Sequence, residues 1–400
     1  MRAITRPMSE FTDATPDLSD VAADDGVLFV QGGVGLAGRG VAVRVGVDEA
    51  PATLAAIPHD STVEGAAPTA VGCVPFAPGS AADLLIPEVT LVKRNDQAWI
   101  TVVHPDDEPI DVDQVLAAPP EPTPSAPEWS ITPMVDVDRY LTAVAAARDA
   151  VRDGVLTKAV IARPIHVEAS MPISVHAVLR RLKATFSSSY RYSVDGFVGA
   201  SPELLVEVDG PVIRSHPLAG TTSRTGDVDN DARLAAALQA SAKNQIEHRV
   251  VIDDVHDRLL RFVSYLDWEP EPSIVTVANV QHLGTRMEGR LSQPGPPVTE
   301  LVRALAPTPA LGGHPRDAAL ELIDRVEGFD RGRYGGAVGW VDAHGNGTWA
   351  VAIRGAEFTD DRRSARLVAG GGIVADSEPL AELAETQAKF QAMLSAIIRP

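Results

Sequence analysis

Cysteine is almost absent from this sequence of 400 residues, since Cys73 is the single one. One cysteine excludes an internal disulfide framework and any zinc site built from several thiolates. Cys73 lies in the stretch "AVGCVPF", whose apolar and small residues are typical of a buried strand. We therefore expect an inert, buried thiol rather than a nucleophile.

Long hydrophobic runs are absent as well. No stretch approaches the roughly 18 apolar residues that a membrane-spanning helix needs. The first 20 residues, "MRAITRPMSEFTDATPDLSD", lack the apolar segment of a signal peptide and soon turn acidic. We expect a cytoplasmic protein without a membrane partner.

Basic residues are in short supply, because 35 Lys and Arg stand against 54 Asp and Glu, for a formal net charge of −19. Such a charge argues against nucleic acid and anionic membranes as partners. It also opposes the approach of an anionic substrate. If the substrate is an anion, local cations from Arg, Lys or a bound metal must overcome the global field.

The hydrophobic content of 45% is enough for a sizeable core. We expect residues 1–24 to be weakly ordered. From 26 to 103, short runs such as "GVLFV" and "AWITVVH" alternate with Pro/Gly-rich turns and predict antiparallel sheet. The segment "APPEPTPSAPEW" (118–129) predicts an extended connector. It would join a variable N-terminal part (1–125) to a catalytic core (130–400).

The core begins with a predicted helix, "VDRYLTAVAAARDAVRDG", which Gly154 is placed to end. The pattern then predicts a strand over 157–167, a helix near 175–186, and a strand pair at "FVGASPELLVEV" and "VIRSHPLAGT". One long helix over 231–264, another over 315–327, a hairpin around "DAHGNG", a strand "ARLVAGGGIV" and a final helix follow. Hairpin-joined strands with helices between some of them favour an α+β fold of large antiparallel sheets flanked by helices.

A glycine motif of the form G-x-G-x-x-G occurs at Gly33, Gly35 and Gly38. A dinucleotide-binding fingerprint requires a helix after the turn. Here the chain continues as "RGVAVRVGV", a strand pattern, so we interpret the motif as a hairpin loop.

Two ionisable residues on strand-like segments are candidate catalytic groups. Lys158 begins "KAVIAR", where it is either a solvated strand end or a catalytic amine. Glu203 lies in "GASPELL" among small and apolar residues. A carboxylate is costly to bury there unless it is paired or protonated, and a raised pKa would make it a general acid.

Carboxylates on two separate helices are candidate metal ligands. Glu247 lies on the long helix, and Glu382, Glu385 and Lys389 share one face of the last helix through their three- and four-residue spacing. Each could equally belong to a solvated helix face. With no cysteine or histidine cluster, carboxylates from two helices suit Mg²⁺ better than zinc.

An anion site is the corresponding hypothesis for two neighbouring segments. Arg354 alternates with apolar residues in "AVAIRGAEF", and an inward arginine is costly unless it meets an anion. The glycines Gly370, Gly371 and Gly372 could offer bare backbone N–H groups to the same anion.

The order of these motifs resembles that of the chorismate-utilising enzymes, and in particular their isochorismate synthase branch. The resemblance spans about residues 137–397 and is carried by "KAVIAR", "GASPELL", "HPLAGT", "AKNQIEHRVVIDDV", "QHLGT", "LAPTPALGGHP", "EGFDRGRYGGAVGW", "AVAIRGAEF", "RLVAGGGIVADSEP" and "ELAETQAKFQAML". It implies the single-domain fold of anthranilate synthase component I and a Mg²⁺-dependent conversion of chorismate to isochorismate.

By the same resemblance, Lys158 activates the water that attacks C2 of the ring, and Glu203 protonates the departing C4 hydroxyl. Lys158 must be uncharged to act as a base. Glu247 and Glu385 would bind Mg²⁺ with the help of Glu382. The groups that would hold the substrate are Gly220, Thr221, Tyr334, Arg354, Gly370, Gly371, Gly372 and Lys389. We expect a monomer.

Two alternatives stay open within the resemblance. Salicylate synthase forms isochorismate and then eliminates pyruvate; "PTPALGGHP" is more similar to the isochorismate synthases. An aminating subunit is disfavoured because such enzymes lack a lysine at the position of Lys158, and because Ala219 replaces the lysine of the P-I-K-G-T motif. Asn244 and Ala306 depart from the residues common in the family.

Overall fold

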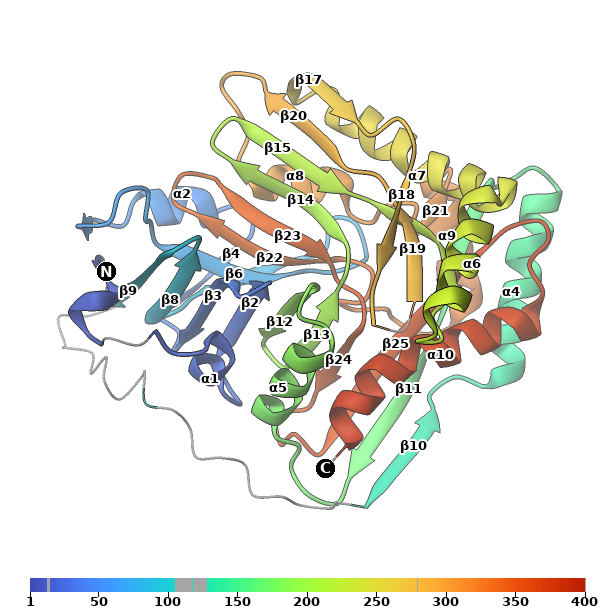
Figure 1. Cartoon of the computed structure of the whole chain (residues 1–400), viewed down its shortest axis with the longest axis horizontal. Coiled ribbons are helices and arrows are strands. Elements are labelled where there is room, and N and C mark those ends of the chain that lie inside the picture. Colours follow the sequence, from blue (N-terminus) through green and yellow to red (C-terminus); the bar gives the residue numbers. More distant parts are fainter. Residues whose placement is uncertain (13–14, 105–116, 118–127, 279, 400) are drawn as a thin grey trace.

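The computed structural model describes residues 1–12, 15–104, 117, 128–278 and 280–399. Two large sheets and one small sheet form its centre, and helices cover their outer faces (Figure 1). Within the described residues, neighbouring strands run antiparallel except for the pair β1–β5. This architecture confirms the predicted α+β class with large antiparallel sheets.

The larger sheet has 13 described strands. Across the sheet they are β10 (Trp129–Pro133), β11 (Lys158–Ala169), β25 (Ser364–Ile373), β24 (Gly355–Phe358), β13 (Phe197–Ser201), β12 (Tyr190–Val194), β2 (Val27–Gln31), β3 (Val34–Arg39), β8 (Val89–Arg94), β9 (Gln97–His104), β1 (Arg2–Pro7) and β5 (His59–Ser61), with β21 (Gly313–His314) beside β11.

The second large sheet packs against the first. Its described strands are β17 (Val263–Trp268), β20 (Met287–Leu291), β15 (Val212–His216), β14 (Leu204–Asp209), β23 (Gly347–Val351), β22 (Ala337–Asp342), β6 (Thr69–Val74), β7 (Asp83–Ile86) and β4 (Val43–Gly46). A small sheet contains β16 (Leu218–Ser223), β19 (Val280–Gly284) and β18 (Ser273–Thr276).

The helices pack against these sheets and against one another. They are η1 (Met8–Glu10), α1 (Leu18–Ala22), α2 (Ala50–Ala55), α4 (Val137–Arg152), α5 (Val175–Thr185), α6 (Val228–Ala240), α7 (Ala242–Leu259), α8 (Val298–Leu305), α9 (Arg316–Glu327) and α10 (Pro379–Ile398). None of the helices in the described part is both long and apolar enough to cross a membrane.

Two predictions about the N-terminal part need correction. The expectation that residues 1–24 are weakly ordered is wrong for residues 2–7, because β1 pairs along its whole length with β9 and also with β5. The polar sequence "RAITRP" does not predict a strand. In the structure Thr5 is nevertheless fully buried, and its hydroxyl lies 2.8 Å from that of Thr101. Trp129, placed in the predicted connector, begins β10, while residues 118–127 lie outside the described residues.

The glycine motif and the cysteine behave as predicted. Gly33, Gly35 and Gly38 belong to the β2–β3 hairpin and its turn. Cys73 is buried on β6, where burial raises the pKa of its thiol to about 12.

Strands from both sides of the proposed division near residue 125 lie side by side in the same sheets. β2 pairs with β12, and β6 pairs with β22. The division into a variable N-terminal part and a catalytic core stays a prediction, and it describes one continuous fold.

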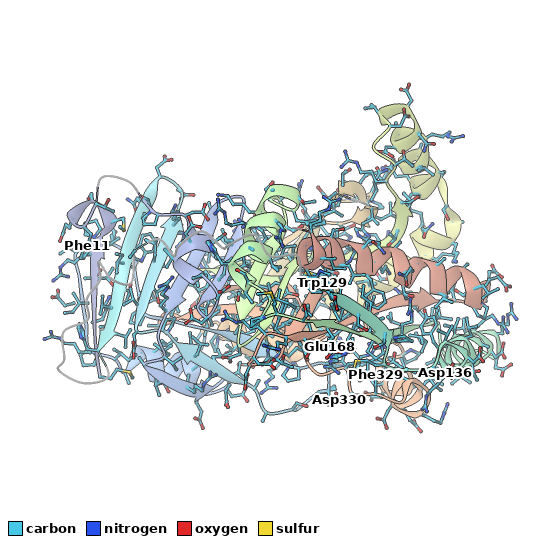
Figure 2. All side chains as sticks on the ribbon, turned by 90° about the horizontal axis from the view of Figure 1, so that it is seen from below. Phe11, Trp129, Asp136, Glu168, Phe329 and Asp330 are labelled. Carbon is cyan, nitrogen blue, oxygen red and sulfur yellow. The ribbon has the colours of Figure 1, made fainter. Side chains whose placement is uncertain are left out.

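The predicted long helix over 231–264 is wrong, because the structure has two helices there. Ser241 separates α6 from α7 with an extended backbone, and its hydroxyl accepts a hydrogen bond from the Asn244 amide at the start of α7. A serine that caps the second helix competes with continuation of the first. Figure 2 shows α6 projecting from the body of the molecule.

Both members of the predicted strand pair are also divided. Pro202 separates β13 in the larger sheet from β14 in the second sheet, and Pro217 separates β15 from β16 in the small sheet. Proline has no N–H to give to a ladder and favours such exits. The chain therefore changes sheet directly beside Glu203.

Candidate active site

A cavity of about 270 Å³ opens between the larger sheet, the small sheet, α7 and α10. Segments far apart in the sequence contribute its walls: the start of β11, the crossing at Glu203, β16, β19, α7, β25 and α10. All the sequence-predicted site residues except Gly371 line it: Lys158, Glu203, Gly220, Thr221, Glu247, Tyr334, Arg354, Gly370, Gly372, Glu382, Glu385 and Lys389.

Lys158 begins β11 and is buried, with 2% of its side chain exposed. The solvated-end interpretation is therefore wrong. Helix α4 ends near Gly154, whose φ of +74° turns the chain toward β11. The Lys158 Nζ donates to Glu247 Oε1 on α7 at 2.7 Å. Release of this ion pair is required before the amine can act as a base.

Glu203 is buried at 3% exposure, directly after the sheet-crossing Pro202. Its Oε1 accepts one hydrogen bond, from the Leu218 backbone N–H at 3.3 Å. Burial raises the pKa of Glu203 to about 8, although this bond and the charge of Lys158 oppose the rise. The carboxyl group is therefore protonated at neutral pH, as a general acid must be.

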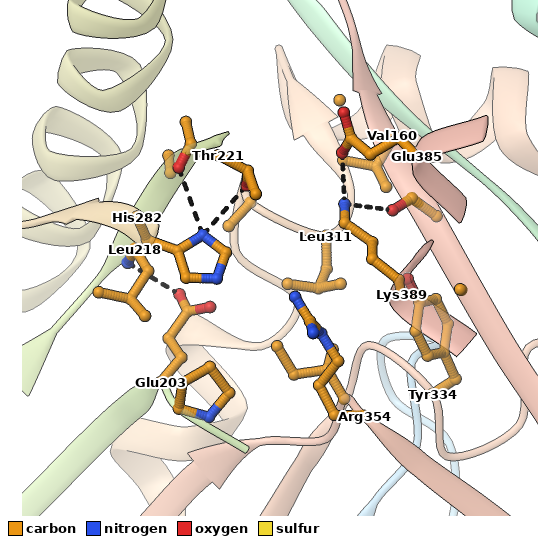
Figure 3. Close-up of a pocket in the computed structure, with 18 of the residues that line it drawn as sticks. Val160, Glu203, Leu218, Thr221, His282, Leu311, Tyr334, Arg354, Glu385 and Lys389 are labelled. Carbon is orange, nitrogen blue, oxygen red and sulfur yellow. Dashed lines mark hydrogen bonds and ion pairs between the residues drawn. The ribbon is translucent and has the colours of Figure 1, made fainter. Parts of the chain in front are cut away.

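Arg354 is a cation that no carboxylate among the described residues pairs with. Its backbone has a φ of +56°, a left-handed conformation that is strained for arginine. Among the described residues, no hydrogen bond or ion pair holds its guanidinium, and burial lowers its pKa. Figure 3 shows the guanidinium in the middle of the cavity, between Glu203 and Lys389. A desolvated guanidinium with free donors is suited to bind an anion.

The carboxylates of α10 enter the cavity from one helix face, as their spacing predicts. Lys389 Nζ lies 2.6 Å from Glu385 Oε1 and donates to the Gly370 carbonyl at 2.7 Å (Figure 3). The charge of Lys389 lowers the pKa of Glu385, whereas burial and the neighbouring Glu385 raise the pKa of Glu382. The two carboxylates thus have different electrostatic environments one turn apart.

A divalent cation fits the donor set. Glu382 is 7% exposed, and its Oε2 is a buried oxygen without a hydrogen-bond partner. Glu247 and Glu385 each hold one lysine that a cation would displace. In the described part of the chain, no three acidic, histidine or cysteine side chains already form a metal-binding cluster. The carboxylates would have to turn toward the ion.

The glycines of β25 make room for these groups. A Cβ on Gly371 would lie 2.7 Å from Glu382 Oε2, and one on Gly372 would lie 2.9 Å from Glu247 Oε1. A Cβ on Gly370 would lie 3.0 Å from the Tyr334 hydroxyl, whose pKa burial raises to about 12. Side chains here would push the site apart. Donation from the glycine N–H groups to an anion stays a prediction.

Sequence reasoning missed His282, which shares the cavity wall with Thr221. Its Nδ1 lies 3.0 Å from Thr221 Oγ1 and 3.3 Å from the Gly220 carbonyl. Burial, together with the charges of Arg354 and Lys389, lowers the pKa of His282 to about 3, so its imidazole is neutral. His282 is the histidine of the motif "QHLGT", but the residues around it in the sequence do not predict that it lines the cavity.

Sequence reasoning also missed a buried ion pair that supports the strand carrying Lys158. Glu327 and Arg331 form a buried ion pair at 2.5 Å, with exposures of 1% and 2%. Arg331 donates to the carbonyls of Val160 and Leu311, both at 2.7 Å, and Glu327 accepts from the Ala162 N–H at 2.7 Å. The pair ties β11, which carries Lys158, to the segment at Leu311, which also lines the cavity.

Comparison with known proteins identifies the class. Residues 54–398 match the family described as "Chorismate binding enzyme". The chain is 40% identical over 346 residues to a Mycobacterium tuberculosis protein named MenF, covering 83% of this chain and 87% of that one. It is 37% identical over 341 residues to isochorismate synthase DhbC of Bacillus subtilis, covering 82% and 81%.

A solved structure agrees with these sequence relatives. That of MenF, the menaquinone-specific isochorismate synthase from Escherichia coli, superposes with a TM-score of 0.84 at 25% identity, covering 100% of this chain and 94% of that one. The chain belongs to the chorismate-binding enzyme family, and its relatives place it beside the isochorismate synthases.

Proposed function

We propose that the protein is an isochorismate synthase that converts chorismate to isochorismate. Water adds at C2 of the ring, and the C4 hydroxyl leaves as water after protonation, so the net reaction is an isomerisation. The observation that carries this proposal is a buried Glu203, whose pKa is raised, in the same cavity as the Lys158 amine and the Arg354 guanidinium.

Each group of the chain has a defined part in this proposal. Lys158, released from Glu247, takes a proton from the attacking water, which is too weak a nucleophile by itself. Glu203 gives its proton to the C4 hydroxyl, because hydroxide is a poor leaving group. Arg354 and Lys389 hold carboxylate groups of the substrate, and Tyr334, Thr221 and the β25 glycines fix its position.

Mg²⁺ is the cation we propose for the carboxylates Glu247, Glu382 and Glu385, since all three offer hard oxygen ligands. When bound, it would neutralise the ring carboxylate of chorismate. This explains how a protein with a net charge of −19 accommodates a dianion. A cytoplasmic location and a monomeric state remain predictions from the sequence.

The test is incubation of the lone chain with chorismate and Mg²⁺ in H₂¹⁸O. We expect isochorismate that carries one ¹⁸O, at the C2 hydroxyl, with no ammonia required and with loss of turnover in excess EDTA. Fluorescent salicylate formed without an added lyase would instead identify a salicylate synthase. Turnover that depends on ammonia would identify an aminating enzyme. Retention of the original C4 oxygen in the product would contradict attack by water.

Glu385→Gln should weaken the dependence on Mg²⁺. The substitution keeps the size of the side chain and removes its charge, so the Mg²⁺ concentration for half-maximal rate should rise at least tenfold, a change of about 1.4 kcal/mol. Glu378→Gln is the matched control, because Glu378 precedes α10 and does not line the cavity. An unchanged Mg²⁺ titration in Glu385→Gln would remove Glu385 from the ligand set.

A further inference from the structure

Lysine is unevenly distributed in this chain. The sequence has five lysines and thirty arginines. Three of the five lysines, Lys158, Lys243 and Lys389, line the active-site cavity, whereas Arg354 is the single arginine among the described residues that line it. The mechanism above uses Lys158, Lys389 and Arg354. Lys243 has no part in it.

Lys243 differs from the other three cations in its surroundings. Lys158 and Lys389 are held by Glu247 and Glu385, and Arg354 lies inside the cavity. Lys243 is exposed on the first turn of α7, and within the described part of the chain no hydrogen bond or ion pair restrains its ammonium group. It is free to reach toward solvent.

We place Lys243 at the mouth of the cavity, because it alone is exposed among the described residues that line the cavity. It lies between the capping Ser241 and Asn244, whose Oδ1 would be 3.2 Å from a Cβ on Gly220 in the cavity wall. Its charge also reaches across to α10, where it lowers the pKa of Glu382 against the stronger effects of burial and Glu385. The ammonium group of Lys243 is thus more exposed to an anion in solvent than the inner cations Lys158, Arg354 and Lys389 are.

We propose that Lys243 is a substrate-recruiting residue, whose free ammonium captures a small dianion at the mouth and passes it to the inner cations. This inference rests on the proposed function, because it requires an anionic substrate. Screening limits exposed charges to a range of about 8 Å at physiological ionic strength. A local cation at the mouth can therefore act on an approaching anion while most of the −19 net charge is screened.

A lysine is better suited than an arginine to capture an anion and release it into the cavity. Its ammonium is a compact point charge on a flexible stem, and it does not require the fixed bidentate geometry of a guanidinium. A group that must bind loosely and then release the anion inward gains from that flexibility. The alternative is that Lys243 is an ordinary solvated helix residue, in which case its removal changes nothing.

The experiment compares Lys243→Gln with Arg249→Gln in steady-state kinetics with chorismate and saturating Mg²⁺. Arg249 is the matched control, because it lies on the same helix with 55% of its side chain exposed and does not line the cavity. Both substitutions remove one positive charge. At low ionic strength we expect kcat/KM to fall about fivefold to tenfold in Lys243→Gln, with kcat within twofold of the unsubstituted protein. Arg249→Gln should change kcat/KM by less than twofold.

Salt and charge replacement separate recruitment from a structural role. The loss in Lys243→Gln should shrink as ionic strength rises to about 0.3 M, since salt screens the charge that was removed. Lys243→Arg should restore kcat/KM, and Lys243→Glu should lower it further. A loss that is equal at all salt concentrations, a parallel fall in kcat, or an unchanged kcat/KM would each overturn the proposal. If the unsubstituted protein does not turn over chorismate, the proposed function fails instead.

Discussion

Lys158→Ala is expected to reduce kcat by about 10²–10⁴-fold, because general-base catalysis contributes a factor of this size. Binding of chorismate in the presence of Mg²⁺ should be largely kept, since Arg354 and the α10 groups remain. Quenched-flow or chromatographic assays of isochorismate give kcat, and calorimetric titration gives the affinity. Turnover near that of the unsubstituted protein would remove Lys158 from the role of base.

Chemical rescue distinguishes a base from a structural cation at this position. Lys158 pairs with Glu247 at 2.7 Å, so its loss could act through an unpaired carboxylate instead. Small primary amines can occupy the space left by the side chain. If Lys158 is the base, rescue should follow the concentration of the neutral amine and rise with pH. Rescue that follows the ammonium form, and falls with rising pH, would assign Lys158 a structural role.

Glu203→Gln should lower kcat by a similar factor of about 10²–10⁴ and change the pH profile. Glu203 must be protonated to act, and its pKa is raised to about 8 by burial. The rate of the unsubstituted protein should therefore fall as pH rises through about 8. The residual rate of Glu203→Gln should not show this fall near pH 8. Glu207→Gln, half-buried on β14 and outside the cavity, should leave both rate and profile unchanged.

Stability gives a readout of Glu203 that does not depend on turnover. The folded protein keeps the proton of Glu203 up to pH of about 8, whereas the unfolded chain loses it near the ordinary value of 4.5. The contribution of Glu203 to the free energy of unfolding should therefore decrease as pH rises from about 4.5 to about 8. Denaturant titrations should show a smaller decrease in Glu203→Gln. Equal pH dependence in both proteins would argue against a raised pKa.

Local patterns predicted the elements that carry the site, because those patterns depend on nearby residues. The face shared by Glu382, Glu385 and Lys389 follows from helix geometry, and all three line the cavity. The strand starting at Lys158 was also predictable. The burial of Lys158 was not, because it depends on Glu247, 89 residues further along the chain. Most of the site was assembled from the family resemblance rather than from spacing.

The errors have physical causes that a local pattern cannot detect. The sequence around Ser241 has helical propensity on both sides, and only tertiary packing decides that this serine caps a new helix. β1 is polar and forms because β9 and β5 offer it hydrogen bonds. Glu203 was recognisable as a costly carboxylate, but the change of sheet at Pro202 that buries it depends on two sheets built from distant segments.

The position of β25 in the larger sheet has a consequence for synthesis on the ribosome. β25 is the last strand of the described chain, yet it lies between β11 and β24 and pairs with both. Until it emerges, β11 and β24 expose unpaired edges, which are templates for aggregation. The part of the larger sheet formed by β11, β25 and β24 can therefore assemble only after nearly the whole polypeptide has been translated. Long-range strand pairing of this kind is slow. We expect nascent chains that stop before residue 364 to need chaperones, and the active site to form last.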